Sequence, residues 1–300
     1  MRNVDAGGGD RLALAVLAQY RMATTEQMHL IIAPGVRIEQ TWRRLAKLRD
    51  EGLVDRSPCR VPAGRGRGSP PSTGQKPPRS GRSCATGGPP GCWRTARPPD
   101  CGQGHSLVVT ETGLAFLQDA RRRGEVCRPL DWIPKVYHPL GSSEAVIPDA
   151  VLFYRSGREG DDDWSMLRAF VEVDRATMGP ERLAAKLTTY ARLYAYTPVT
   201  VGRPRNTFHQ EPARENWRRR YPLFPRLLFI LDSTGPTGID NPIRALRATA
   251  RDLVPPGFVH QVPILAPPLT DLLHNGPSAP VWHPDQNPDH TVSWTHPRHP

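Results

Sequence analysis

Carboxylates in two apolar segments are the residues of this chain best suited to chemistry. Asp149, preceded by proline, lies in the run 146–153, and Glu172 lies in the run 167–174. Both runs have the composition of short β-strands, so the two acids could meet on neighbouring strands. Mg²⁺ prefers oxygen ligands, and it activates water for phosphodiester hydrolysis. Asp149 and Glu172 are therefore the candidate metal ligands.

Hydrolysis also needs a cation that stabilises developing negative charge. Asp174 follows Glu172 by two residues, so it shares the same strand face and adds a negative charge instead. Lys186 lies on a helix expected over 180–194, near the edge of its apolar face. Its long side chain could reach the acids. Two hypotheses stay open: a catalytic lysine, or an ion pair that neutralises buried acids.

The elements around these residues predict a mixed α/β (α+β) domain over residues 125–275. The continuously apolar run 226–232 indicates a strand buried on both faces, which requires helices on each side of the sheet. The expected strands are 146–153, 167–174, 226–232 and 261–265, and the expected helices are 180–194 and 242–253.

The N-terminal residues 11–55 predict three helices. Thr24 and Gln27 have the spacing of a capping box at the start of the second helix. The third helix is expected from about residue 36 to Glu51, followed by a strand after Gly52. A returning strand over 106–110 and a closing helix would complete a winged helix-turn-helix domain.

The third of these helices has an apolar stripe and a polar face. The stripe is formed by Ile38, Trp42, Leu45 and Leu48, which we expect to pack inward. Cationic and amide side chains on the other face are typical of a helix that lies in the major groove. The candidate DNA contacts are Arg37, Gln40, Thr41, Arg44 and Lys47.

The net charge of +11 comes mainly from one biased segment. Residues 56–104 contain nine basic residues and one acidic residue, and they are rich in glycine and proline. Such a composition cannot bury a core, so we expect a disordered insert over 57–104. It is either an arginine- and glycine-rich arm that contacts phosphates or a reading-frame artefact. The expected organisation is a winged helix (1–56 and 105–124), the insert, the α/β domain and a disordered tail (276–300).

Several classes of protein are disfavoured. No run of 18 apolar residues is present, so no membrane span is expected. No Gly-x-x-x-x-Gly-Lys-Ser/Thr loop is present, so a nucleoside triphosphate is not an expected ligand. Five cysteines without a Cys-x-x-Cys pair argue against a disulfide framework and favour the cytoplasm.

Together these motifs resemble the replication-relaxation family of bacterial plasmid and mobile-element proteins. The resemblance rests on the N-terminal helices, Pro148-Asp149, Glu172-Val173-Asp174, and a helix with Lys186 and Tyr190 four residues apart. It covers about residues 10–56 and 106–235. The second block resembles, more remotely, the PD-(D/E)xK nuclease superfamily. Asp149 and Glu172 match the metal-binding acids of that superfamily, whereas Asp174 stands in place of its lysine.

The resemblance implies DNA-linked work in plasmid or mobile-element replication or transfer (DNA relaxation). Because Asp174 replaces the lysine, our first hypothesis is an accessory protein that binds double-stranded DNA without cutting it. One alternative is a Mg²⁺-dependent nickase or endonuclease, whose catalytic residues would be Asp149, Glu172, Asp174 and Lys186. Another is a winged-helix transcriptional regulator whose second domain forms a homodimer.

Overall fold

The computed structural model describes residues 8–58, 91–95, 103–158, 160, 162–175, 179–198, 215–232, 236–285 and 290–295. The chain divides into two compact units, Met1–Thr110 and Glu111–Pro300. Among the described helices, none combines the length and apolar character needed to cross a membrane.

The first unit contains three helices and an antiparallel sheet with the strand order β1-β3-β2. The predicted capping box is confirmed, because Thr24 Oγ1 accepts from Gln27 N at 3.1 Å and Gln27 Oε1 accepts from Thr24 N at 3.0 Å. These bonds satisfy backbone groups that a helix start leaves open. The elements are α1 (Gly8–Tyr20), β1 (Met22–Thr24), α2 (Thr25–Ile32), α3 (Ile38–Asp50), β2 (Val54–Pro58) and β3 (Gly91–Thr95).

The returning strand is β3, which lies inside the segment 57–104 that the sequence assigned to a disordered insert. It pairs with both β1 and β2, and its Trp93 is fully buried with Nε1 donating to Thr25 Oγ1 at 2.9 Å. Cys92 is disulfide-bonded, contrary to the expectation from the cysteine count. Residues 59–90 and 96–102 of the expected insert lie outside the described residues.

The strand expected over 106–110 is wrong, because these residues belong to one long helix, α4 (Gln103–Arg123). Val108-Val109-Thr110 favours a strand locally, but packing overrides this preference. Leu107 packs with a cluster on β1 and β3, and Thr110 Oγ1 donates to Met22 O at 3.0 Å. The boundary between the two units falls within this helix.

The second unit is built on a six-stranded mixed sheet with the order β11-β10-β9-β8-β7-β4. β8, β9 and β10 are parallel, whereas β4, β7 and β11 are antiparallel to their neighbours. All six residues of β9 are buried, which confirms the predicted central strand. The strands are β4 (Trp132–Pro134), β7 (Ala150–Ser156), β8 (Ser165–Asp174), β9 (Arg226–Leu231), β10 (Ile264–Ala266) and β11 (His283–Pro284), with a separate pair β5 (His138–Pro139) and β6 (Ala145–Val146).

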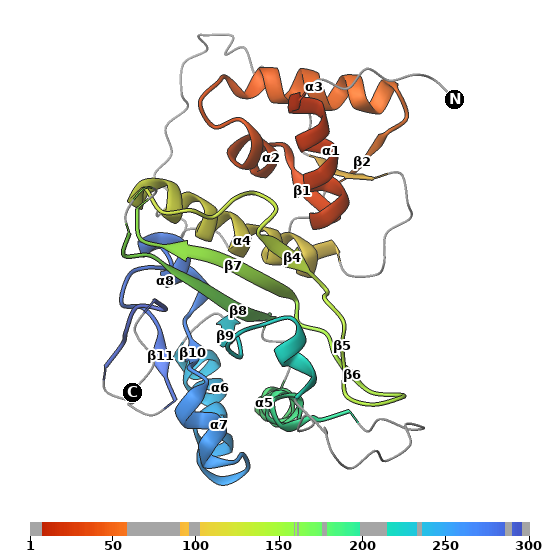
Figure 1. Ribbon diagram of the computed structural model, residues 1–300. Helices are drawn as coiled ribbons and strands as arrows, with labels where there is room; N and C mark the ends of the chain where they lie inside the picture. Colours follow the sequence, from red (N-terminus) through yellow and green to blue (C-terminus); the bar gives the residue numbers. More distant parts are fainter. Residues whose placement is uncertain are drawn as a thin grey trace, which may run out of the picture. The chain divides into compact units, whose positions relative to one another are not determined.

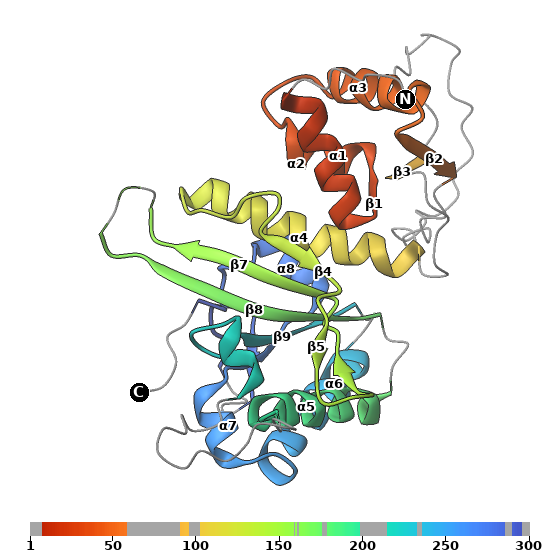
Figure 2. The ribbon, with the colours of Figure 1, turned by 45° about the vertical axis from the view of Figure 1, so that its right-hand side comes forward.

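Helices cover both faces of this sheet, with α5, α6 and α7 on one face and α4 and α8 on the other (Figures 1 and 2). Leu187 of α5 and Leu246 of α6 share a buried cluster with Phe170 and Phe229 of the sheet. The predicted mixed α/β class is therefore confirmed. The helices are α5 (Pro180–Ala195), the 3-10 helix η1 (Asn216–Arg219), α6 (Pro236–Asp252), α7 (Pro256–Gln261) and α8 (Leu269–Asn275).

The C-terminal segment, predicted to be disordered over 276–300, packs into the second unit where it is described. Trp282 and Trp294 are fully buried, and their ring centroids lie 6.2 and 5.2 Å from that of Phe116 on α4. These tryptophans are isolated among prolines and polar residues, so they form no periodic pattern that would predict their burial. Residues 286–289 and 296–300 lie outside the described part.

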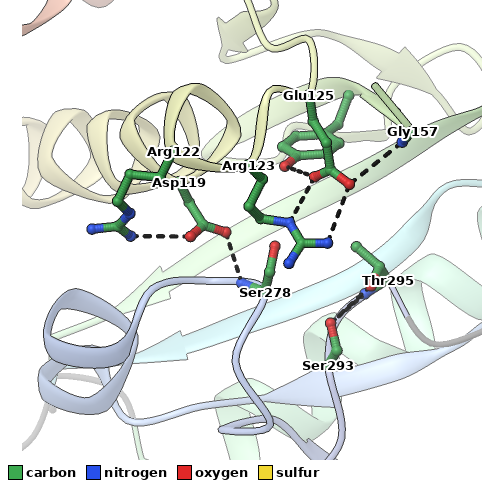
Figure 3. Close-up of polar contacts among 9 residues, drawn as sticks. Asp119, Arg122, Arg123, Glu125, Gly157, Ser278, Ser293 and Thr295 are labelled. Atoms are coloured by element: carbon green, nitrogen blue, oxygen red, sulfur yellow. Dashed lines mark hydrogen bonds and ion pairs between the residues drawn. The ribbon is translucent and has the colours of Figure 1, made fainter. Parts of the chain in front are cut away.

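Polar contacts around the end of α4 fasten two segments that are distant in sequence (Figure 3). Asp119 accepts a hydrogen bond from Ser278 N at 3.0 Å. Glu125 accepts from Arg123 Nε at 3.0 Å and from Gly157 N, at the end of β7, at 3.4 Å. Carboxylates that accept several hydrogen bonds in this way hold the C-terminal segment and the β7–β8 hairpin in place.

Candidate functional site

Pairing of three strands places Lys135, Asp149 and Glu172 side by side. In the β4–β7 register, Lys135 falls one residue beyond the last pair and faces Asp149. In the β7–β8 register, Asp149 likewise falls opposite Glu172. Lys135 Nζ forms an ion pair with Asp149 Oδ1, and Val173 N donates to Asp149 Oδ2 at 2.9 Å. The sheet itself therefore assembles the candidate acids and supplies a lysine.

Helix α5 completes the site from the face that it covers. Lys186 Nζ lies 2.5 Å from Glu172 Oε2, and Tyr190 OH donates to Glu172 Oε1 at 2.7 Å. The two side chains lie one helical turn apart, so both point at the same carboxylate. Lys186 thus forms an ion pair with a buried acid, which is one of the two arrangements that the sequence left open.

The third acid, Asp174, is buried and lies on the same face of β8 as Glu172. A lysine at this position would carry a positive charge, whereas the carboxylate of Asp174 is negative. Two lysines from other elements, Lys135 and Lys186, instead bring positive charge to the acids. Three carboxylates and two ammonium groups therefore share this site.

Burial controls protonation in the site. Glu172 is 4% exposed, and burial raises the pKa of its carboxyl although the charge of Lys186 opposes the shift. Burial alone would lower the pKa of Lys186, but the charge of Glu172 and the hydrogen bond to it raise this pKa above its usual value. Burial and the adjacent Glu172 also raise the pKa of Tyr190. Lys186 is thus held as a cation, and Tyr190 as a neutral donor.

The oxygen donors of the site suit a small hard cation, but lysine ammonium groups already contact them. Asp149 and Glu172 offer carboxylate oxygens on one face of the sheet, and each already contacts an ammonium group. Within the described ranges, no three carboxylate, imidazole or thiolate groups converge as metal ligands. A divalent ion would therefore require Lys135 to leave Asp149, and Lys135 is 45% exposed at its side chain.

Lys135 is the residue that sequence analysis missed. It lies in a segment for which no strand or helix is expected from the sequence, and its partner Asp149 is 14 positions away. A usable signal was composition: lysine occurs at only four positions (47, 76, 135 and 186), although lysine and arginine together number 40. Two of these rare lysines contact the two candidate metal ligands.

The candidate DNA contacts on α3 are only partly on its exposed face. Thr41 is fully buried, and its Oγ1 lies 3.1 Å from His29 Nδ1, so the expected outward position is wrong. Arg44 Nε lies 3.0 Å from Asp10 Oδ1, and Lys47 Nζ lies 3.6 Å from Asp10 Oδ2. Both cations therefore share one carboxylate of α1.

Arg37 and Gln40 are exposed, as expected of groove contacts, and Arg43 is exposed beside them. The predicted inward stripe is correct for Leu45 and Leu48 but wrong for Ile38 and Trp42, which are 36% and 41% exposed. The buried face is formed by Thr41, Leu45 and Leu48, so it is rotated from the predicted stripe, and Arg43 falls close to the opposite side. A helical wheel centred on these buried residues would have placed Arg43 on the exposed face.

Comparison with known proteins adds one finding. The family model described as replication-relaxation matches residues 14–205, which is more than half of the 300-residue chain. Neither the search of curated proteins nor the search of solved structures found a match. The matched range contains α3, both lysines of the acidic site and its three carboxylates.

Proposed function

Because the chain belongs to the replication-relaxation family, we propose that it binds duplex DNA in the cytoplasm during plasmid or mobile-element replication or transfer. In this proposal it holds the DNA without cutting it. The first unit is a winged helix, in which α3 enters the major groove and the β2–β3 hairpin is the wing. Three helices followed by an antiparallel hairpin support this assignment.

The observation that carries the proposal is the exposed face of α3. Arg43 is exposed near the middle of this helix, and within the described residues it has no carboxylate partner. Gln40 is exposed about one turn earlier, and Arg37 is exposed at the N-cap of the helix. Guanidinium and amide groups are the side chains that contact phosphates and the edges of guanine and adenine.

A gel shift with a labelled duplex tests the proposal. Arg43→Ala should weaken binding by about tenfold, because one phosphate or base contact is worth about 1–3 kcal/mol. Arg11→Ala is the matched control, since Arg11 is likewise an exposed arginine but lies on α1 rather than on α3. Equal binding by wild type and Arg43→Ala would reject α3 as the DNA contact.

The acidic site supports a second candidate, a Mg²⁺-dependent nickase. Lys135 and Lys186 supply cations that Asp174 cannot, and Asp149 and Glu172 have the oxygen donors that magnesium prefers. These two acids would hold the ion, which supplies charge neutralisation and an activated water when bound. Lys135 would leave Asp149 and contact the scissile phosphate.

Incubation of supercoiled plasmid with the full chain and magnesium separates the two candidates. Binding without cutting predicts no relaxed product while the gel shift is retained. Nicking by wild type that is lost in Asp149→Asn would establish the enzyme instead. Asparagine keeps an oxygen that can accept from Val173 N, so this variant tests charge rather than the strand contact.

A further inference from the structure

A hollow of about 270 Å³ lies on the β7–β8 hairpin, away from the acidic site. Its lining includes Phe153, Arg155, Trp164 and Met166, and the segment before β4 closes its edge. In the β7–β8 register, Arg155 faces Met166 and Phe153 faces Arg168, so these four side chains share one face of the sheet. This is the face that bears Asp149, about 20 Å away along β7.

Aromatic and apolar groups are exposed here. Trp164 is 47% exposed and Met166 is 41% exposed. The guanidinium of Arg155 lies over the Trp164 ring, 4.5 Å from its centroid, and that of Arg168 lies 5.8 Å from the Phe153 centroid. The N–H groups of an arginine that stacks on an aromatic ring point outward, parallel to the ring. In this orientation they can donate hydrogen bonds to a phosphate.

Neither arginine is within ion-pair distance of a carboxylate in the described part of the chain, although Asp131 also lines the hollow. The Nε atoms of Arg155 and Arg168 are buried without a hydrogen-bond partner. Buried donors are normally satisfied, so these guanidinium groups have hydrogen-bonding capacity that the described residues do not fill. The ligand should therefore carry an anionic acceptor and a flat ring that can stack on an aromatic side chain.

We propose that this hollow binds an unpaired nucleobase of single-stranded DNA, stacked on Trp164, with its phosphate held by Arg155, which lines the hollow. A base in a duplex is already stacked between neighbours, whereas an unpaired base offers its face to an aromatic side chain. Asp162 and Asp163 are exposed at the hairpin tip, so the strand should run from the hollow toward the interior of the sheet. The inference rests on the proposed function, because it assumes that DNA is the partner of this protein.

Fluorescence anisotropy of the full chain with labelled oligothymidine tests the inference, with a blunt duplex as a second probe. Trp164→Leu should weaken oligothymidine binding by about tenfold, since stacking of one base is worth about 1–3 kcal/mol. Trp164→Phe should bind within about threefold of wild type, because it retains a ring. Duplex binding should be unchanged in both variants.

Arg155→Gln should also weaken oligothymidine binding and reduce its salt dependence by about 0.7 in the log–log slope, as expected for one phosphate contact. Arg158→Gln is the matched control, since Arg158 is exposed on the same hairpin but does not line the hollow. Wild-type affinity of Trp164→Leu for oligothymidine would overturn the inference, as would an equal loss for the duplex. Competition by polyglutamate that equals that of unlabelled oligothymidine would assign the hollow to acidic peptides instead.

The two proposals fail separately. Loss of duplex binding in Arg43→Ala reports on α3, whereas loss of oligothymidine binding in Trp164→Leu reports on the hollow. If the protein binds oligothymidine through Trp164 but does not bind the duplex, the proposed function is rejected and the assignment of the hollow is retained.

Discussion

At the scale of single residues, Glu172 determines how the acidic site behaves. It is buried, and its two oxygens are taken by Lys186 and Tyr190. A buried charge is tolerable only when it is paired and hydrogen-bonded, so each partner matters more than a surface contact would. Asp149 differs, because a backbone N–H and a half-exposed lysine satisfy it.

Removing the two lysines should therefore have unequal effects. Lys186→Met should lower the free energy of unfolding by about 2–3 kcal/mol at neutral pH, because it leaves Glu172 without its cation. Lys135→Met should cost less than about 1 kcal/mol, since water can replace a side chain that is 45% exposed. Urea denaturation measures both values, and equal losses would contradict this difference.

The defect of Lys186→Met should shrink as the pH falls. Burial raises the pKa of Glu172, and loss of the lysine should raise it further, so the carboxyl is neutralised at a pH above its unfolded value. A neutral carboxyl needs no cation, and the destabilisation is present above the folded pKa and lost below it. A constant difference from wild type between pH 7 and pH 5 would contradict the assignment of a charged Glu172.

Tyr190→Phe should also destabilise the second unit. The variant removes a buried donor to Glu172, at an expected cost of about 1–3 kcal/mol. Tyr194→Phe on the same helix is the control, because its hydroxyl donates to Gln261 in an exposed contact and should cost less than about 1 kcal/mol. Urea denaturation of both variants at pH 7 gives the comparison.

At the scale of elements, β5 carries a buried histidine that should make stability depend on pH. His138 lies 2.8 Å from the Tyr221 hydroxyl, and burial lowers its pKa from 6.5 to about 4. The unfolded chain therefore binds a proton that the folded protein excludes, so stability is lost as the pH falls from 6.5 toward 4. Between pH 7 and pH 4.5 this loss should be about 2–3 kcal/mol.

His138→Gln should remove that loss, because glutamine can bond Tyr221 but does not titrate. The informative quantity is the free energy of unfolding of wild type minus that of the variant, measured by urea at both pH values. Carboxylates that titrate in the same range cancel in this difference. No change in the difference would show that His138 is protonated in the folded protein.

The elements predicted from sequence were those with a regular pattern. Helix α5 was expected over 180–194 and spans Pro180–Ala195, and β8 was expected over 167–174 and spans Ser165–Asp174. Long apolar periods define such elements without tertiary information. α4 was mistaken in part for a strand, because its β-branched residues are buried by contacts with β1 and β3 that no local pattern reveals.

The sequence predicted the acids of the site and Lys186, but it did not predict Lys135. Asp149 and Glu172 belong to recognisable strands, and Lys186 to a recognisable helix. Lys135 contacts Asp149 only because β4 pairs with β7, and β4 is three residues long with a proline. Pairing of so short an edge strand is determined by tertiary packing, here the burial of Trp132, and sequence periodicity cannot supply it.

At the scale of the whole molecule, the two units divide the proposed work between them. In the proposed function, the exposed face of α3 in the first unit binds duplex DNA. The second unit contains the acidic site with its two lysines and the aromatic hollow that we propose to bind an unpaired strand. Of the net charge of +11, most lies in residues 56–104, so the overall charge does not locate the DNA contact.

The dependence of duplex affinity on salt tests the central claim most directly. Anisotropy titrations over a range of salt concentrations give the log–log slope for wild type, Arg43→Ala and Arg11→Ala. If α3 holds the DNA, Arg43→Ala should weaken binding and reduce the slope by about 0.9, the value for one phosphate contact, while Arg11→Ala should match wild type. Identical affinity and slope for wild type and Arg43→Ala would contradict the account.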